Sequence, residues 1–179
     1  MLSVQIFTFN AFEENTYIVY NDDGDAIVID PGCYSAAEKS TLLNFVHSHK
    51  LKVVQLINTH CHLDHIFGNT LIASTFGLEL YIHPNEEQIL QLSPQAGKMY
   101  GVPFDNYTGP LHFLNQGNVV KLGKDDLTVL VTPGHSPGSI RPRAGVTLHC
   151  GSDARKEYRR PTSRLGLRPH VYYHQHAEN

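Results

Sequence analysis

The seven residues 59–65, Thr-His-Cys-His-Leu-Asp-His, constrain this chain more than any other segment. They place three imidazoles and a carboxylate directly after the apolar run at 53–57, which is typical of a buried strand. Imidazole nitrogen together with carboxylate oxygen suits zinc, iron or manganese, whereas calcium prefers oxygen ligands alone. The alternative is a polar loop that holds histidines by chance. Three histidines and an aspartate at this spacing favour a metal site.

The composition fits one globular domain. The chain has 179 residues, 41% of them hydrophobic, and a net charge of −3. No apolar run reaches membrane-spanning length, and residues 1–3 lead straight into strand-like sequence, so we expect a cytoplasmic protein with no membrane partner. The three unpaired cysteines (33, 61 and 150) suit a reducing compartment.

Hydrophobic patterning predicts strands that later alternate with helices. Such an order favours sheets covered by helices, in an α/β or α+β layered domain. The segment 93–118 is rich in Pro, Gly and Asn, and we expect it to be a long surface loop. The predicted strands are 4–9, 16–20, 26–29, 53–58, 79–83, 119–122 and 127–132, and the predicted helices run from 35 to about 50, over 68–76 and over 85–92.

A second histidine motif follows the strand predicted at 127–132. Residues 132–139 read Thr-Pro-Gly-His-Ser-Pro-Gly-Ser, so that Pro and Gly fix the turn around His135. A single histidine in a turn is usually only solvated. Beside the first cluster, His135 becomes a candidate fourth imidazole.

With both motifs in view, residues 1 to about 140 resemble the metallo-β-lactamase-fold hydrolases. The pattern is most similar to the small bacterial glyoxalase II-like enzymes, which hydrolyse S-acylglutathione thioesters. The resemblance implies an αββα sandwich, with the metals at one edge of the paired sheets. The matching motifs are Asn15-Thr16-Tyr17, Asp30-Pro31-Gly32, Thr59 to His65 and Thr132 to Ser139.

The resemblance also implies the roles of individual side chains. His60, His62 and His135 would hold one metal, and Asp64 and His65 would belong to a second. The family adds an aspartate that bridges both metals, after a strand ending in Gly-Asp, and a further histidine near the C-terminus. The expected cofactors are two zinc ions, with iron or manganese as alternatives.

The two-metal expectation agrees with elementary chemistry. Two divalent ions roughly 3.5–4 Å apart can hold a hydroxide between them and polarise the carbonyl that it attacks. Asp64, the candidate catalytic carboxylate, is therefore better interpreted as a ligand than as a free general base. A thiolate departs easily, so a thioester needs little help from a general acid. Cys61 is a tempting nucleophile, but its place between two predicted ligands favours a side chain that points into the fold.

Residues 141–179 depart from the family pattern. All seven arginines of the chain lie there, which a random scatter would produce with a probability on the order of 10⁻⁵. We hypothesise that the coding frame shifts near codon 140, which would leave the sandwich incomplete at its C-terminus. Reading the coding DNA in its other two frames tests this, because the hypothesis requires a Gly-Asp motif there. Asp153 lies near the distance expected for the bridging aspartate but follows a serine.

Several functions remain open at this point. A genuine basic tail could bind nucleic acid, but it carries no known binding motif and the chain is net acidic, so we expect no nucleic-acid partner. We favour a metallohydrolase that acts on a small-molecule thioester. The alternatives are an inactive, truncated or frameshifted metal-binding fragment, and, within the same superfamily, a β-lactamase, a nuclease or a single-iron thiol or persulfide oxygenase.

Overall fold

A computed structural model describes residues 2–144 of the chain. These residues form a mixed six-stranded sheet and an antiparallel three-stranded sheet. In the larger sheet the strands follow one another in chain order: β1 (Leu2–Phe9), β2 (Glu14–Asn21), β3 (Asp25–Ile29), β4 (Lys52–Ile57), β5 (Leu80–Ile82) and β6 (Leu111–Phe113). The smaller sheet holds β7 (Val119–Leu122), β8 (Asp125–Val131) and β9 (Ile140–Ala144).

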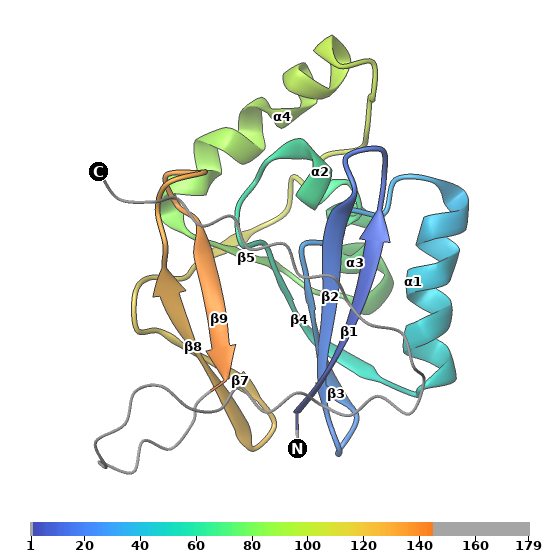
Figure 1. Ribbon diagram of the computed structural model, residues 1–179, viewed down its shortest axis with the longest axis vertical. Helices are drawn as coiled ribbons and strands as arrows, with labels where there is room; N and C mark the ends of the chain where they lie inside the picture. The colour runs from blue at the N-terminus through green and yellow to red at the C-terminus, as the bar shows by residue number, and fades with distance from the viewer. Residues whose placement is uncertain (1, 145–179) are drawn as a thin grey trace, which may run out of the picture. The chain divides into compact units, whose positions relative to one another are not determined.

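Helices cover one face of the larger sheet, and the smaller sheet covers the other (Figure 1). Side chains alternate between the two faces of a strand. On β2, Ile18 joins the core under the helices, whereas Val19 joins the core between the sheets, and Leu56 and Ile57 of β4 divide in the same way. The helical elements are α1 (Ala36–Ser48), α2 (Leu63–Ile66), α3 (Asn69–Phe76), the 3₁₀ turn η1 (Pro84–Glu86) and α4 (Glu87–Met99).

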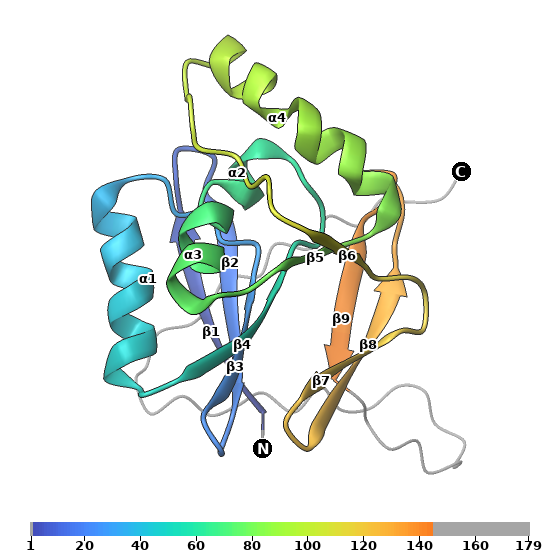
Figure 2. The same cartoon turned by 180° about the vertical axis from the view of Figure 1, so that it is seen from behind.

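Residues 2–144 thus form the helix, sheet and sheet layers of the expected α+β sandwich. β4 and β8 end at the same edge of these layers, and α4 lies across that edge (Figure 2). The loops that follow β4 and β8 carry the two histidine motifs, so the topology brings the motifs together. No helix among the described residues is long and apolar enough to cross a membrane.

The helix signals of the sequence are confirmed at α1 and α3. Ser35 caps α1 and forms the predicted capping box with Glu38. α3 ends at Gly77, whose left-handed backbone (φ 66°) suits glycine at a helix end.

The expected loop at 93–118 is wrong in its first part, because α4 continues to Met99 with Pro94 inside it. Proline has no N–H to donate to the carbonyl four residues earlier, which here belongs to Leu90. The side-chain amide of Asn106 donates to that carbonyl instead, at 2.9 Å. A residue from the following loop therefore supplies the hydrogen bond that the helix lacks. β6 also lies within the segment expected to be loop.

The boundary expected at residue 140 falls at the start of β9. This strand continues four residues beyond it, and Arg141 and Arg143 pair with Leu130 and Thr128 of β8. The remaining expectations for the tail, including Asp153, the shifted frame and the incomplete sandwich, concern residues that lie outside those the structure describes.

Candidate metal centre

Buried polar side chains hold the loop that follows β4. Asp30, at the end of β3, accepts hydrogen bonds from the backbone N–H of Thr59 at 2.6 Å and from its hydroxyl. Asn58 donates to the carbonyl of His65 at 3.1 Å and accepts from Asn69 of α3 at 2.7 Å. Both ends of the histidine segment, at Thr59 and at His65, are therefore held by side chains from outside the segment.

Three imidazoles converge beside this loop. They belong to His60, His62 and His135, which we call the triad. Nδ1 of His62 and Nε2 of His135 lie 2.9 Å apart, although 73 residues separate them in the chain. One nitrogen from each ring falls within 4.8 Å of the others. The sequence-predicted residues of the first metal are thus brought together.

Two nitrogens of the triad lie near the spacing that a tetrahedral metal gives its ligands. With metal–nitrogen bonds of about 2.0–2.1 Å, tetrahedral zinc separates two ligand nitrogens by about 3.3 Å, close to the observed spacing of His62 and His135. His60 lies against Thr59 through its Nδ1, whereas its Nε2 is buried with no hydrogen-bond partner among the described residues. A buried nitrogen without a partner is costly unless something binds it. A metal ion would satisfy it.

Burial also keeps His60 and His62 in the form that binds metal. It lowers the pKa of His60 to about 4, and the nearby His65 acts in the same direction. Burial, followed by the proximity of His135, lowers the pKa of His62. Both rings are therefore neutral at pH 7 and present lone pairs, as metal ligation requires.

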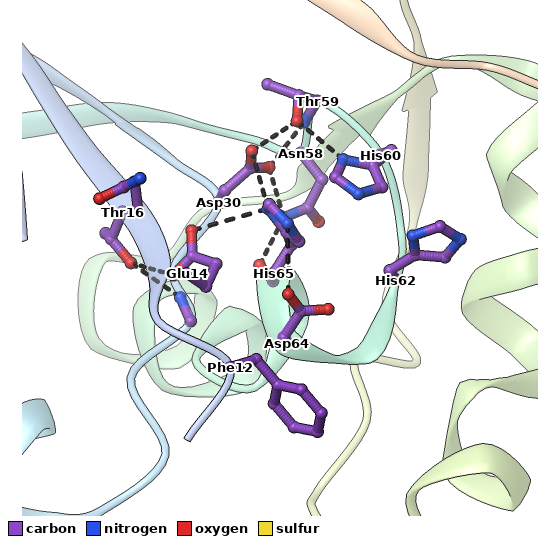
Figure 3. A network of polar contacts seen from close by, with 12 residues as sticks. Phe12, Glu14, Thr16, Asp30, Asn58, Thr59, His60, His62, Asp64 and His65 are labelled. Carbon is purple, nitrogen blue, oxygen red and sulfur yellow. Dashed lines mark hydrogen bonds and ion pairs between the residues drawn. The ribbon is translucent and has the colours of Figure 1, made fainter. Parts of the chain in front are cut away.

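A second group, the acid cluster, lies beside the triad and comprises Glu14, Asp30, Asp64 and His65 (Figure 3). Nδ1 of His65 lies 3.2 Å from Asp30, and its Nε2 lies 3.4 Å from Asp64. A carboxylate that holds one nitrogen of a histidine while the other faces a site is common in metal centres. Besides the triad, the described residues that could hold an ion are Asp30, His60 and His65, whose ligand atoms lie within 4.8 Å of one another; Asp64 lies beside His65 but is not in this group.

The charges of the acid cluster act on its own members. Burial alone would lower the pKa of His65, but contact with Asp30 and the charge of Asp64 outweigh it, and the pKa is raised. Burial, together with the nearby charge of Asp30, raises the pKa of Glu14 to about 10. Glu14 is therefore protonated at pH 7.

The loop that presents His135 depends on a glycine. Gly134 has a φ of 154°, which L side chains rarely adopt, and it turns the chain directly before His135. The backbone N–H of Ile140, at the start of β9, donates to the carbonyl of Thr59 at 2.9 Å. That bond joins the bases of the two histidine loops.

Sequence reasoning did not assign several residues that shape the site. Asp30 appeared only as part of an Asp-Pro-Gly motif, and Glu14 and Glu86 were not singled out. Local signals for buried acids are weak, since Glu14 lies within an ordinary strand pattern. Cys61 is buried, and burial raises the pKa of its thiol well above the usual value, as expected of a side chain that is no nucleophile.

Comparison with known proteins agrees with this geometry. Hydroxyacylglutathione hydrolase GloC of Haemophilus influenzae is 28% identical over 141 residues, covering 78% of this chain and 65% of GloC. The chain therefore spans slightly less than two thirds of the length of this curated relative.

Two solved structures share the fold at similar identity. The B3 metallo-beta-lactamase BLEG-1 is 27% identical, with a TM-score of 0.68, covering 78% of this chain and 66% of that one. The protein TTHA1623, solved in a di-iron-bound form, is 26% identical, with a TM-score of 0.65, covering 76% of this chain and 64% of that one. Residues 10–147 match the model of the metallo-beta-lactamase superfamily, and the chain belongs to that superfamily.

Proposed function

We propose that this chain is a cytoplasmic, metal-dependent hydrolase of S-acylglutathione-type thioesters. The observation that carries the proposal is the convergence of three imidazoles on one point, with a buried Nε2 of His60 that has no hydrogen-bond partner among residues 2–144. Thioester specificity is supported by the name of a relative, hydroxyacylglutathione hydrolase, at 28% identity.

In this proposal His60, His62 and His135 hold one divalent metal, and Asp64 and His65 contribute to a second. Zinc suits these donors, and iron is supported by the di-iron form of a relative. Asp153 stays a candidate for the bridging carboxylate. Metals bound there would polarise the thioester carbonyl and lower the pKa of a water molecule.

The chain's own residues orient this chemistry. Exposure rises from the buried His60 through the half-buried His62 to the exposed His135, so the substrate carbonyl approaches on the His135 side. Asp30 holds His65 from behind, which directs its other nitrogen toward Asp64. Hydrolysis breaks the C–S bond and releases a thiol whose pKa is about 8.5, so departure as thiolate needs no proton donor.

The test is hydrolysis of an S-hydroxyacylglutathione by the full chain, followed through release of free thiol. We expect zinc-loaded protein to hydrolyse the thioester, chelation to abolish the reaction and added zinc to restore it. A His60→Ala variant, as control, should lack both metal and activity. A chain that holds metal but leaves the thioester intact contradicts the substrate, and a chain that binds no metal leaves the inactive-fragment alternative.

A further inference from the structure

Glu86 is a fully buried acid that the proposed chemistry does not use. It ends η1 and directly precedes α4. Its carboxylate accepts three hydrogen bonds: from the backbone N–H of Cys61 at 2.8 Å, from the hydroxyl of Ser136 at 2.6 Å and from the backbone N–H of Gly138 at 2.7 Å. Among residues 2–144, no lysine or arginine forms an ion pair with it.

These three donors belong to the two loops that carry the triad. Cys61 lies between His60 and His62, whereas Ser136 and Gly138 follow His135 on the loop that joins β8 to β9. The N-terminal end of α4 lies beside this second loop (Figure 2). One carboxylate therefore connects two segments that lie far apart in the sequence.

The connection is tight on both sides. A Cβ on Gly138 would lie 2.8 Å from Cγ of Glu86, so only glycine allows the loop to approach this closely. On the other side the hydroxyl of Ser93 of α4 lies 3.1 Å from the carbonyl of Cys61 and 2.7 Å from the carbonyl of Ile89, and its one proton is shared between these two acceptors. Cys61 is thus held at its N–H by Glu86, and the Ser93 hydroxyl lies against its carbonyl.

We propose that Glu86 is a positioning residue that sets the spacing of the His62 and His135 imidazoles and thereby determines how tightly the triad binds a metal. The inference rests on the metal site of the proposed function. The bond between Ile140 and Thr59 joins the loops at their bases, and Glu86 joins them near the histidines, where the ring nitrogens lie 2.9 Å apart. Loss of a group that orients a metal ligand lowers metal affinity by about 10- to 100-fold.

The test substitution is Glu86→Gln, which keeps the shape but replaces one acceptor oxygen by an NH₂ donor that faces donors. The matched control is Asn21→Asp. Asn21 is 4% exposed and makes three hydrogen bonds, one of them to the carbonyl of Leu122 at 3.0 Å, which connects β2 to β7 away from the histidine loops. Both substitutions remove part of a buried hydrogen-bond network, so both should reduce stability.

Zinc affinity of the full chain is measured by competition with a chromophoric chelator, and the absorption spectrum of the Co²⁺-loaded protein reports ligand geometry. Urea unfolding of the metal-free protein measures stability separately. We expect Glu86→Gln to raise the zinc Kd by about 10- to 100-fold and to change the Co²⁺ spectrum, and Asn21→Asp to do neither. If Glu86→Gln does not fold, Ser136→Ala is tested in its place. That substitution removes one of the three bonds, so the zinc Kd should rise by a smaller factor.

A double-mutant comparison tests whether Glu86 affects zinc affinity through His135. If Glu86 acts by placing His135, Glu86→Gln should change the zinc Kd much less in a His135→Ala background than in wild type. Equal effects in both backgrounds, or a zinc Kd and Co²⁺ spectrum of a folded Glu86→Gln that match those of wild type, overturn the inference. A wild-type chain that binds no zinc instead overturns the proposed metal site, and the inference with it.

Discussion

The triad and the acid cluster share one edge of the fold but offer different chemical groups. In the triad, ring nitrogens face one another, and Nε2 of His60 has no partner among the described residues. In the acid cluster, Asp30 already accepts hydrogen bonds from Thr59 and contacts His65. The acid cluster also holds buried atoms with no hydrogen-bond partner among the described residues, Oε1 of Glu14 and Nδ1 of His65, so the two clusters differ in the kind of donor they offer and in the protein contacts of Asp30.

The two clusters therefore have different roles in metal binding. His60 and His62 of the triad offer neutral imidazoles, because burial lowers the pKa of both. The acid cluster concentrates carboxyl groups, and burial beside Asp30 keeps one of them, Glu14, protonated. We infer that the triad contributes most of the affinity for the first metal, while Asp30 and Glu14 hold the second pair, Asp64 and His65, in place.

The largest expected effect is a loss of bound metal, and it should differ between variants of the triad and variants of the acid cluster. His135→Ala should weaken binding of the first metal by more than the roughly 10- to 100-fold that loss of a group behind a ligand costs, because it removes a ligand itself. His65→Ala should leave that first, tight metal in place and lose the second. Metal per chain after dialysis, measured by mass spectrometry, distinguishes them. Equal losses in both variants would contradict the division into two clusters.

Asp30→Asn should produce the largest loss of stability within the acid cluster. Asparagine tolerates the left-handed backbone of Asp30 (φ 50°) as well as aspartate does, so the backbone is not strained. Its amide, however, places a donor against the N–H or the hydroxyl of Thr59, and an unsatisfied buried group costs about 1–3 kcal/mol. Urea unfolding of the metal-free protein measures the free energy of unfolding.

A suitable control is Asp126→Asn, which removes the exposed ion pair with Lys121 at 2.8 Å. Exposed pairs contribute only about 0–1 kcal/mol. If the two substitutions cost the same, Asp30 does not support the loop in the way its contacts indicate.

Glu14→Gln should change how stability depends on pH. The pKa of Glu14 rises from 4.5 to about 10 on folding, so between these values the folded chain binds the proton more tightly than the unfolded chain does. Stability from this group is therefore lost as pH rises through that window. A neutral glutamine avoids the loss, so the stability of the variant relative to wild type should grow by about 4 kcal/mol between pH 5 and pH 8.

The measurement is urea unfolding of both chains in the presence of a chelator at several pH values. The informative result is the sign of the change in this stability difference as pH rises. A difference in unfolding free energy that stays constant from pH 5 to pH 8 would show that Glu14 is not held protonated by the acid cluster.

Local signals in the sequence were sufficient for the parts of the fold that depend on neighbours in the chain. The capping box at Ser35, the glycine end of α3 and the strand before His60 are all local patterns, and the structure contains each of them. The convergence of His62 and His135 could also be expected, since both motifs follow strands.

What could not be predicted depends on contacts between distant residues. Glu86 receives its donors from residues 25, 50 and 52 positions away, and no local pattern marks it. The sequence predicts a loop from residue 93, because the segment is rich in Pro, Gly and Asn. The Asn106 amide that compensates for Pro94 inside the helix lies in a stretch with no regular pattern, so the continuation of α4 could not be predicted.

The smallest expected effect concerns the hydrogen bond from Asn106 to the carbonyl of Leu90, in the helix that begins beside the triad. Asn106→Ala leaves the carbonyl of Leu90, a residue only 2% exposed, without its donor one turn after Glu86. We expect a loss of about 1 kcal/mol in the free energy of unfolding, with the zinc affinity of the triad nearly unchanged because Glu86 keeps all three of its bonds. Gln91→Ala, on the outer face of α4, is the control. A clear loss of zinc affinity in Asn106→Ala would mean that the triad depends on the whole of α4, and not on Glu86 at its start.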